Sequence, residues 1–286
     1  MTAPSATPPG PRMTVIGAGR LGAALAASLR NAGQPFDHTP RSQVEPWVDR
    51  LPTAPEGRVW VFAVRDREIA AVAARCAPAM RPGDTLVHLA GMLGPEALGE
   101  VARAVGAASV SAHPLAAVSS PRDQALAPRS AFLLEGDDAA VTEIAKQLQH
   151  LGYVTFTAEG VRRPAYHAAA ALVATGAVAL AQGAQTLFRA ALGEAATEPF
   201  VRAATSSLLR SVALNLCLDG PAAALASPLL RDDTSTVEAH LAVGDALAPR
   251  AAAMYRAALL QVLDGLAVER RVSEATVARA REVIAR

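Results

Sequence analysis

A glycine-rich segment near the N-terminus has the spacing of a phosphate-binding turn. Its six residues are Gly17, Ala18, Gly19, Arg20, Leu21 and Gly22. In such a turn the first glycine permits the tight bend, the second lets the backbone approach a pyrophosphate, and the third lets the next helix pack closely. The helix N-terminus then offers free N–H groups to phosphate oxygens. Because a predicted strand precedes the turn and a predicted helix follows it, the segment predicts a dinucleotide site and not an unliganded turn.

The residues after the second predicted strand bear on which dinucleotide binds. An acidic residue there would hold the ribose 2′-hydroxyl of NAD, whereas an arginine would accept the 2′-phosphate of NADP. The chain has Arg41 and Ser42 at this position, and their guanidinium and hydroxyl groups suit a phosphate dianion. Asp37 is acidic and close in sequence, but it falls within the strand. We therefore expect NADP, with NAD held by Asp37 as the alternative.

Three further side chains suit proton transfer. Hydride transfer to a carbonyl or imine needs a proton donor, and imidazole titrates in the useful range. His113 follows the predicted strand Ala108 to Ala112, so it is expected at the carboxyl edge of the sheet. Tyr166 and His167 begin the first long helix of the second half, and a resemblance to known reductases implies that either could donate the proton instead. Each of the three also has a structural interpretation, as a turn or junction residue.

Short strands and helices alternate through the first half of the chain. The expected strands are Met13 to Ile16, Phe36 to Thr39, Val59 to Val64, Thr85 to Leu89, Ala108 to Ala112 and Ala131 to Leu134. The expected helices are Leu21 to Asn31, Glu68 to Met80, Pro95 to Val105 and Ala139 to Leu151. This alternation predicts parallel strands joined by crossover helices. Ala63 and Val64 then end one strand at the cofactor edge, and Ala90 and Gly91 follow another, inside which His88 lies as a hydrogen-bonded core residue.

Helical patterns alone follow residue 160. Breakers at Gly193, Gly220-Pro221, Pro228 and Pro249 separate them, and Ser235-Thr236-Val237-Glu238 predicts a capping box that opens a helix. The fold class is therefore α/β, a Rossmann-like doubly wound parallel sheet followed by an all-α C-terminal domain. We expect a disordered leader at 1–11, a dinucleotide-binding domain at 12–158 and a helical substrate and dimerisation domain at 159–286.

Composition excludes several classes of protein. The net charge of +1 argues against a nucleic-acid or acidic-membrane partner. Cys76 and Cys217 lack CxxC spacing and predict buried small residues in a reducing cytoplasm. No two histidines have the i, i+4 spacing with a carboxylate that would predict a metal site. Ala168 to Ala181 is apolar but short of the roughly 20 residues of a membrane span, so a buried helix is expected.

With these residues in hand, the chain resembles the NADP oxidoreductases that join a Rossmann-like domain to a helical domain of undefined function. That group is similar to pyrroline-5-carboxylate reductase, prephenate dehydrogenase and ketopantoate reductase. The resemblance spans nearly the whole chain after the leader. Beyond the glycine turn and Arg41-Ser42, it rests on Phe62 to Asp66, His88 to Gly91, His113-Pro114-Leu115, Tyr166 to Ala170, Asn215, Gly220-Pro221 and Arg231 to Asp233. The chain departs from the usual family residues at Arg65, Ala90, Gly176, Ala226-Ser227-Pro228 and Asp232.

The resemblance implies roles for several residues. His113 matches the catalytic histidine of a His-Pro-Met/Leu element in prephenate dehydrogenase, and the helix carrying Tyr166 and His167 faces the nicotinamide in related reductases. Asn215 and Arg231 match family positions that suit substrate binding, and Arg162 or Arg163 is an alternative carboxylate anchor. The C-terminal domain is expected to be 6-phosphogluconate-dehydrogenase-like and to form a homodimer.

We therefore expect an NADP-dependent reductase of a small oxo- or imino-carboxylate. Ketopantoate-reductase-like chemistry is the first expectation, although the catalytic lysine of those enzymes has no counterpart, since Lys146 is the only lysine. The alternative is a non-catalytic dinucleotide-binding redox sensor or regulatory protein. That protein would need the glycine turn but not His113, Tyr166 or His167.

Overall fold

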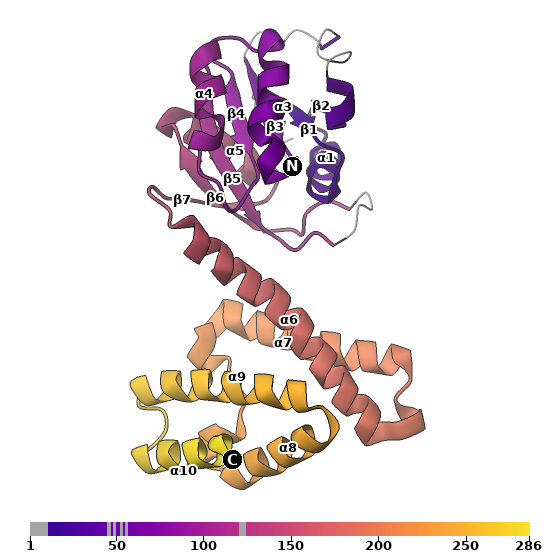
Figure 1. The fold of residues 1–286 in the computed structure, drawn as a ribbon, viewed down its shortest axis with the longest axis vertical. Coiled ribbons are helices and arrows are strands. Elements are labelled where there is room, and N and C mark those ends of the chain that lie inside the picture. Colours follow the sequence, from indigo (N-terminus) through magenta and orange to yellow (C-terminus); the bar gives the residue numbers. More distant parts are fainter. Residues whose placement is uncertain (1–10, 45–46, 48–49, 52–53, 55–56, 120–123) are drawn as a thin grey trace, which may run out of the picture. The chain divides into compact units, whose positions relative to one another are not determined.

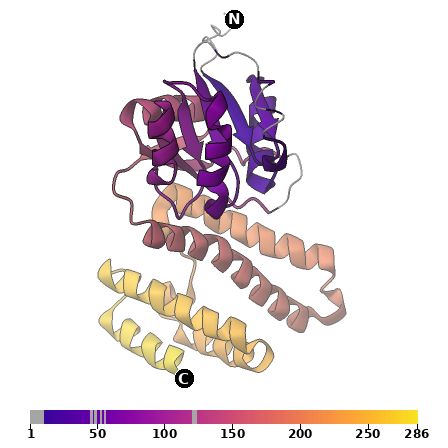
Figure 2. The same ribbon diagram turned by 45° about the horizontal axis from the view of Figure 1, so that its top comes forward.

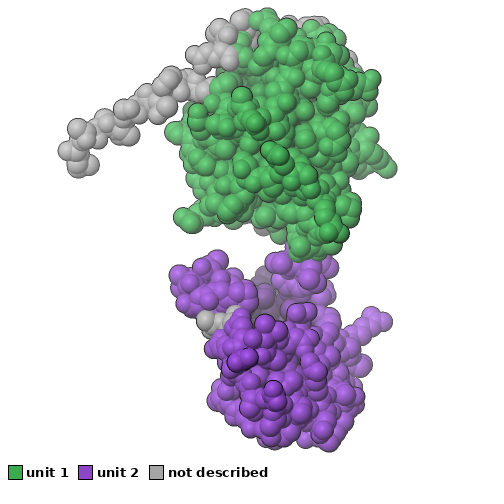
Figure 3. Space-filling view, turned by 90° about the vertical axis from the view of Figure 1, so that its left-hand side faces the viewer, with its two compact units in different colours: residues 1–170 green, residues 171–286 purple. Residues whose placement is uncertain are grey.

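The computed structural model describes residues 11–286 except 45–46, 48–49, 52–53, 55–56 and 120–123. The predicted leader therefore lies almost entirely outside the described residues. The chain divides into two compact units, residues 1–170 and 171–286 (Figure 3). The division falls inside one long helix, so that its first two turns, with Tyr166 and His167, belong to the first unit.

The first unit is built on a seven-stranded sheet (Figure 1). Its strands are β1 (Arg12–Ile16), β2 (Phe36–Thr39), β3 (Arg58–Phe62), β4 (Thr85–His88), β5 (Ala108–Leu115), β6 (Ala131–Gly136) and β7 (Val154–Thr157). They lie in the order β2-β1-β3-β4-β5-β6-β7, and every neighbouring pair is parallel except β5 with β6. The order reverses at β1, because β2 and β3 flank it on opposite sides. Ligands of such sheets bind at this reversal, beyond the carboxyl ends of the strands.

Among the described residues, four helices cover the two faces of the sheet (Figure 2). They are α1 (Arg20–Asn31), α3 (Ile69–Cys76), α4 (Glu96–Val105) and α5 (Asp138–His150). Alternate strand residues point to opposite faces. Val15 and Val61 therefore pack with α1 and α5, whereas Trp60 and Phe62 pack with α3 and α4. Burial on both faces explains why the central strands are nearly continuous apolar runs.

Two parts of the sheet differ from the sequence expectation. β5 extends past Ala112 to Leu115, because β6 runs antiparallel beside it and pairs His113 with Leu133. His113 and Pro114 therefore lie within the strand and do not follow it. The edge strand β7 was not expected, since its four residues are only partly buried and lack a strong apolar pattern.

The second unit is helical, as predicted. Its elements are the greater part of α6 (Arg163–Leu192), then α7 (Glu198–Ala223), α8 (Thr234–Leu247), α9 (Pro249–Val268) and α10 (Glu274–Ala285). Gly220 has a left-handed φ of 75° and kinks α7, and Pro249 occupies the first turn of α9. The predicted capping box at Ser235 is wrong by two residues. Asp233 caps α8 instead, because its carboxylate accepts the Thr236 N–H at 3.0 Å.

Two burial expectations are wrong for the isolated chain. Cys76 is buried, but Cys217 is exposed on α7. The apolar helix over Ala168 to Ala181 is also exposed, with Leu172 at 75% and Val173 at 74%. The unit's own core forms elsewhere, where Leu229, Val237 and Leu263 pack together. Alanine-rich composition indicated a buried helix, but the described residues of the second unit do not bury its apolar side chains.

Candidate functional site

The glycine turn lies at the reversal point of the sheet, between β1 and α1. Gly17 adopts a φ of 123°, which favours glycine, and a Cβ there would lie 2.2 Å from the Ala63 carbonyl oxygen. A Cβ at Gly22 would lie 1.9 Å from the carbonyl oxygen of Gly17. Backbone hydrogen bonds fix the turn against its neighbours, from Gly17 to Thr39 at 2.9 Å and from Ala63 to Ile16 at 2.8 Å. Gly17 and Gly22 are therefore glycine because β1, β3 and α1 pack closely here.

Gly19 has a different environment from its two companions. A Cβ at Gly19 would meet no heavy atom within 4 Å in the described part of the chain. Gly19 is also the N-cap of α1, and no side chain among the described residues caps that helix. The first amides of α1 therefore have open space before them, and the first turn holds Arg20 and no acidic residue. This environment fits a phosphate group.

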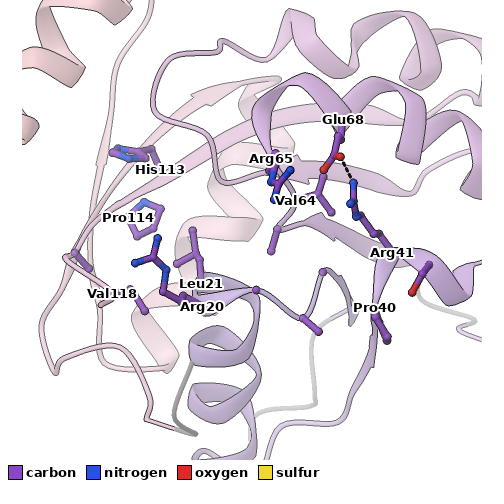
Figure 4. Close-up of a pocket in the computed structure, with 16 residues that line it drawn as sticks. Arg20, Leu21, Pro40, Arg41, Val64, Arg65, Glu68, His113, Pro114 and Val118 are labelled. Carbon is purple, nitrogen blue, oxygen red and sulfur yellow. Dashed lines mark hydrogen bonds and ion pairs between the residues drawn. The ribbon is translucent and has the colours of Figure 1, made fainter. Parts of the chain in front are cut away.

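A cavity of about 800 Å³ begins at the turn and extends to both sides (Figure 4). Its lining residues are Gly17, Ala18, Gly19, Arg20, Leu21, Pro40, Arg41, Ser42, Ala63, Val64, Arg65, Glu68, His113, Pro114, Ala116 and Val118. Of the residues predicted to bind cofactor, Gly22, Ala90 and Gly91 do not line it. Gly22 packs beneath the turn, and Ala90 and Gly91 are buried at the end of β4. The cavity joins the glycine turn to the candidate proton donor His113.

The Asp37 carboxylate forms its contacts within the sheet. Asp37 lies in β2 opposite Thr14, and its carboxylate accepts from the Arg12 Nε at 2.8 Å and from the Arg58 Nη1 at 2.6 Å. Burial alone would raise the pKa of this carboxyl, but the hydrogen bonds from the two arginines outweigh it and hold the pKa below its usual value. Asp37 does not line the cavity, whereas Arg41 and Ser42 do. The alternative in which Asp37 holds a ribose hydroxyl therefore loses its geometric basis.

His113 and Tyr166 form a hydrogen-bonded pair within the first unit. The His113 Nδ1 lies 2.8 Å from the Tyr166 hydroxyl, and their rings meet edge to face with centroids 5.4 Å apart. Burial is the main cause that lowers the pKa of His113 to about 4, and the neighbouring His167 and Arg163 contribute to this shift in the same direction. Burial also raises the pKa of Tyr166. At neutral pH the imidazole and the phenol are therefore both uncharged.

Gly91 marks the point where two imidazoles converge. A Cβ at Gly91 would lie 2.7 Å from the His113 Nε2 and 2.7 Å from the His167 Nδ1. The His167 Nδ1 is buried and has no hydrogen-bond partner among the described residues. All three predicted proton donors are thus brought together by β4, β5 and the start of α6. A side chain at position 91 would fill the space between the two histidines.

A buried cation beside this cluster was not singled out by the sequence. Arg163 opens α6, is 8% exposed and pairs through its Nη2 with Glu135 of β6. Its Nε and Nη1 are buried without hydrogen-bond partners in the part of the chain that the structure describes. Its charge opposes protonation of His113 and partly offsets the rise in the pKa of Tyr166 that burial causes. The sequence offered Arg163 only as one of two equivalent arginines, because no local pattern shows that Glu135 would bury it.

The other predicted residues have different surroundings. Asn215 lies on α7 and Arg231 in the short helix before Asp232, both in the second unit. Arg231 is exposed. His88 is fully buried, contacts the Gly94 carbonyl at 2.9 Å and receives the Ala90 N–H at 3.3 Å, as expected of a core histidine.

Comparisons with known proteins agree with this fold. The model of a domain of unknown function, DUF2520, matches residues 130–261. No curated protein shows a significant match to the chain. Among solved structures, a Thermotoga maritima protein is 22% identical with a TM-score of 0.58, over 95% of this chain and 98% of that one.

Two further structures carry descriptions of function. A Bacteroides fragilis protein, suggested to be an NADP oxidoreductase, is 17% identical with a TM-score of 0.63, over 88% of this chain and 98% of its own. A variant imine reductase from Myxococcus stipitatus, solved with NAD+, is 19% identical with a TM-score of 0.50, over 95% and 99%. At these identities the likeness is one of fold. It confirms the expected fold, a Rossmann-like domain followed by a helical one.

Proposed function

We propose that this chain, a Rossmann-like domain followed by a DUF2520-type helical region, is an NAD(P)-dependent oxidoreductase. More specifically, we infer a reductase that uses NADPH on a small oxo- or imino-carboxylate. The observation that carries the proposal is the single cavity that joins the glycine turn to His113. A non-catalytic dinucleotide sensor would not require a proton donor there, least of all one hydrogen-bonded to a second.

A reduced nicotinamide, when bound, supplies hydride to an electrophilic carbon, and the chain must supply a proton to the attached oxygen or nitrogen. We assign this proton to the Tyr166–His113 pair. In this assignment the Tyr166 hydroxyl donates to the His113 Nδ1, so that the ring hydrogen of the neutral imidazole sits on Nε2 and is available to the substrate. Transfer of that hydrogen is followed by movement of the Tyr166 proton to Nδ1. The nearby positive charge of Arg163 favours the resulting phenolate. His167 is the alternative donor.

The substrate class is supported by charge and by the described relatives. Arg163 places an incompletely hydrogen-bonded positive charge near the paired donors, which favours a carboxylate or another anion. Asn215 and Arg231 are further candidates to hold it. Ketopantoate-like, prephenate-like and pyrroline-carboxylate-like substrates are the first to screen, and the imine reductase of similar fold adds imines to these substrates.

The first test is a fluorescence titration of the wild-type protein with NADPH and with NADH. We expect saturable binding of NADPH, and weaker binding of NADH. Arg41→Ala should weaken NADPH selectively, whereas the exposed Arg250→Ala serves as a charge-matched control that changes neither affinity. Failure of both dinucleotides to bind at millimolar concentration would overturn the proposal.

The second test measures oxidation of NADPH with the screened substrates. Loss of a general acid typically costs a factor of about 100 or more, so Tyr166→Phe and His113→Gln should lower kcat by at least this amount. Gly91→Ala should also abolish turnover, because its methyl would crowd the His113 Nε2 and the His167 Nδ1. All three variants should retain NADPH binding. Tight binding with no turnover on any substrate would favour the redox sensor or regulatory protein.

We also propose that the protein acts as a homodimer in the cytoplasm. The exposed apolar side chains of α6 and α7, among them Leu172, Val173 and Leu218, support a second copy as the partner. The two cysteines lie far apart in the sequence and lack CxxC spacing, which supports a reducing compartment.

A further inference from the structure

One end of the cavity is lined by three charged side chains from two loops. Arg41 begins the short helix Arg41–Gln43 after β2, while Arg65 and Glu68 belong to the turn Arg65–Glu68 after β3. All three line the cavity that contains the glycine turn. Figure 4 shows Arg41 joined to Glu68 by a dashed line, and in this view Arg65 lies nearer to them than His113 does. This end of the cavity is where a dinucleotide bound at the glycine turn would place its adenosine ribose.

Arg41 is not free to act alone. Its Nη1 contacts the Glu68 carboxylate in an ion pair, and its backbone carbonyl accepts a hydrogen bond from Arg75 of α3 at 3.1 Å. A carboxylate next to this guanidinium offsets much of its charge. It would also repel a phosphate dianion that approached the same group.

Arg65 is the second positively charged side chain at this end of the cavity. Its side chain is exposed, lines the cavity and makes no hydrogen bond or ion pair within the described residues. Its backbone is extended and leads directly out of β3, so the side chain leaves the sheet at the cofactor edge. Arg65 is therefore a cation placed beside Arg41 and Glu68 with its hydrogen-bonding capacity unused.

We propose that Arg65 and Glu68 determine which dinucleotide this protein prefers. In this proposal Arg65 is a second ligand of the 2′-phosphate of NADP, and the Glu68 carboxylate weakens the binding of that phosphate. The proposal rests on the proposed function and deepens it. With two guanidinium groups and one carboxylate, the cluster carries a net positive charge that a 2′-phosphate would neutralise. NADH has a 2′-hydroxyl at this point and gains nothing from Arg65.

A different role for Glu68, direct binding of the ribose, would make its removal weaken NADH binding. A carboxylate in this position can accept hydrogen bonds from the 2′- and 3′-hydroxyls of NADH, in which case Glu68 favours NADH directly. The two roles predict opposite effects of its removal. If Glu68 only restrains Arg41, neutralising it tightens NADPH and leaves NADH unchanged. If Glu68 binds the ribose, neutralising it weakens NADH.

The experiment is calorimetric titration of full-length protein with NADPH, NADH, 2′,5′-ADP and 5′-AMP. The variants are Arg65→Ala and Glu68→Gln, and Arg67→Ala is the matched control, because Arg67 lies two residues away, is exposed and does not line the cavity. One charge-assisted hydrogen bond corresponds to a factor of about 10 in affinity. We expect Arg65→Ala to weaken NADPH and 2′,5′-ADP about tenfold, and NADH and 5′-AMP less than twofold.

Glu68→Gln should tighten NADPH several-fold, and Arg67→Ala should change no affinity more than twofold. Thermal melts would show that the exposed substitutions leave the fold intact. Equal effects of Arg65→Ala and Arg67→Ala, or a loss of NADH affinity in Glu68→Gln, would overturn this inference while the dinucleotide site stands. Absence of binding of every dinucleotide to wild type would overturn both proposals together.

Discussion

His113 lies in an environment that keeps its imidazole neutral, and this links the residue to the pH dependence of folding. Burial lowers its pKa to about 4 in the folded chain, against about 6.5 when unfolded. Between these values the unfolded chain binds more protons, so the free energy of unfolding decreases as the pH falls through this window. This loss of unfolding free energy is at most about 3.4 kcal/mol. In urea melts at pH 7.5 and pH 4.5, wild type should lose more stability than His113→Gln. Equal losses would contradict the neutral imidazole.

At the same scale, Gly19 and Gly22 should respond differently to one added methyl group. Gly19→Ala places the methyl in open space, so it should cost less than about 1 kcal/mol and yet weaken NADPH at least tenfold, because phosphates need that space. Gly22→Ala places the methyl against the Gly17 carbonyl and should cost about 2 kcal/mol or more. Thermal melts and NADPH titration of both variants separate the two effects. Full NADPH affinity in a folded Gly19→Ala protein would argue against the phosphate site.

At the scale of elements, the pairing of β1, β2 and β3 depends on a partly buried ion cluster. Asp37 of β2 joins Arg12 of β1 to Arg58 of β3, and the Arg58 side chain is only 6% exposed. Removing one partner of such a pair leaves a charge uncompensated, so Asp37→Ala should destabilise the protein by about 3 kcal/mol.

A surface ion pair supplies the control for Asp37. Asp264 and Arg281 are each 59% exposed, and Asp264→Ala should change stability by less than about 1 kcal/mol. Because Asp37 does not line the cavity, its removal should also leave the ratio of NADPH to NADH affinity unchanged. A shift of that ratio toward NADPH would return Asp37 to the cofactor.

At the scale of the whole molecule, the second unit exposes apolar side chains that a binding partner would bury. Two helical segments, 163–195 and 249–268, are long and apolar enough by composition to cross a membrane. We expect a second copy of the chain to cover the surface instead. Sedimentation velocity of the wild type should show a dimer, and Leu172→Glu combined with Leu218→Glu should shift it toward monomer. The exposed Arg210→Glu is the control and should remain dimeric. Partition of the wild type into detergent micelles as a monomer would oppose this expectation.

Sequence alone determined the features that depend on neighbours along the chain. The strand, glycine turn and helix from Met13 to Asn31 form one local unit, so their glycines and apolar residues predict both the fold and the phosphate-facing edge. Alternation of strands and helices predicted the sheet, and the breaker at Pro249 predicted a helix limit, whereas Gly220 marks a kink inside α7. Such patterns reflect backbone geometry and local burial, which a sequence records directly.

Only the tertiary structure decided the relations between distant segments. The extension of β5 to Leu115 requires β6 beside it, and the commitment of Asp37 requires Arg12 and Arg58. The burial of Arg163 requires Glu135. The lack of space for a side chain at Gly91 depends on His113 and His167, which lie on other elements. Glu68 beside Arg41 is a contact across 27 positions of the chain. Charge pairing and side-chain packing act through space, so their outcome is fixed only when the sheet brings these residues together.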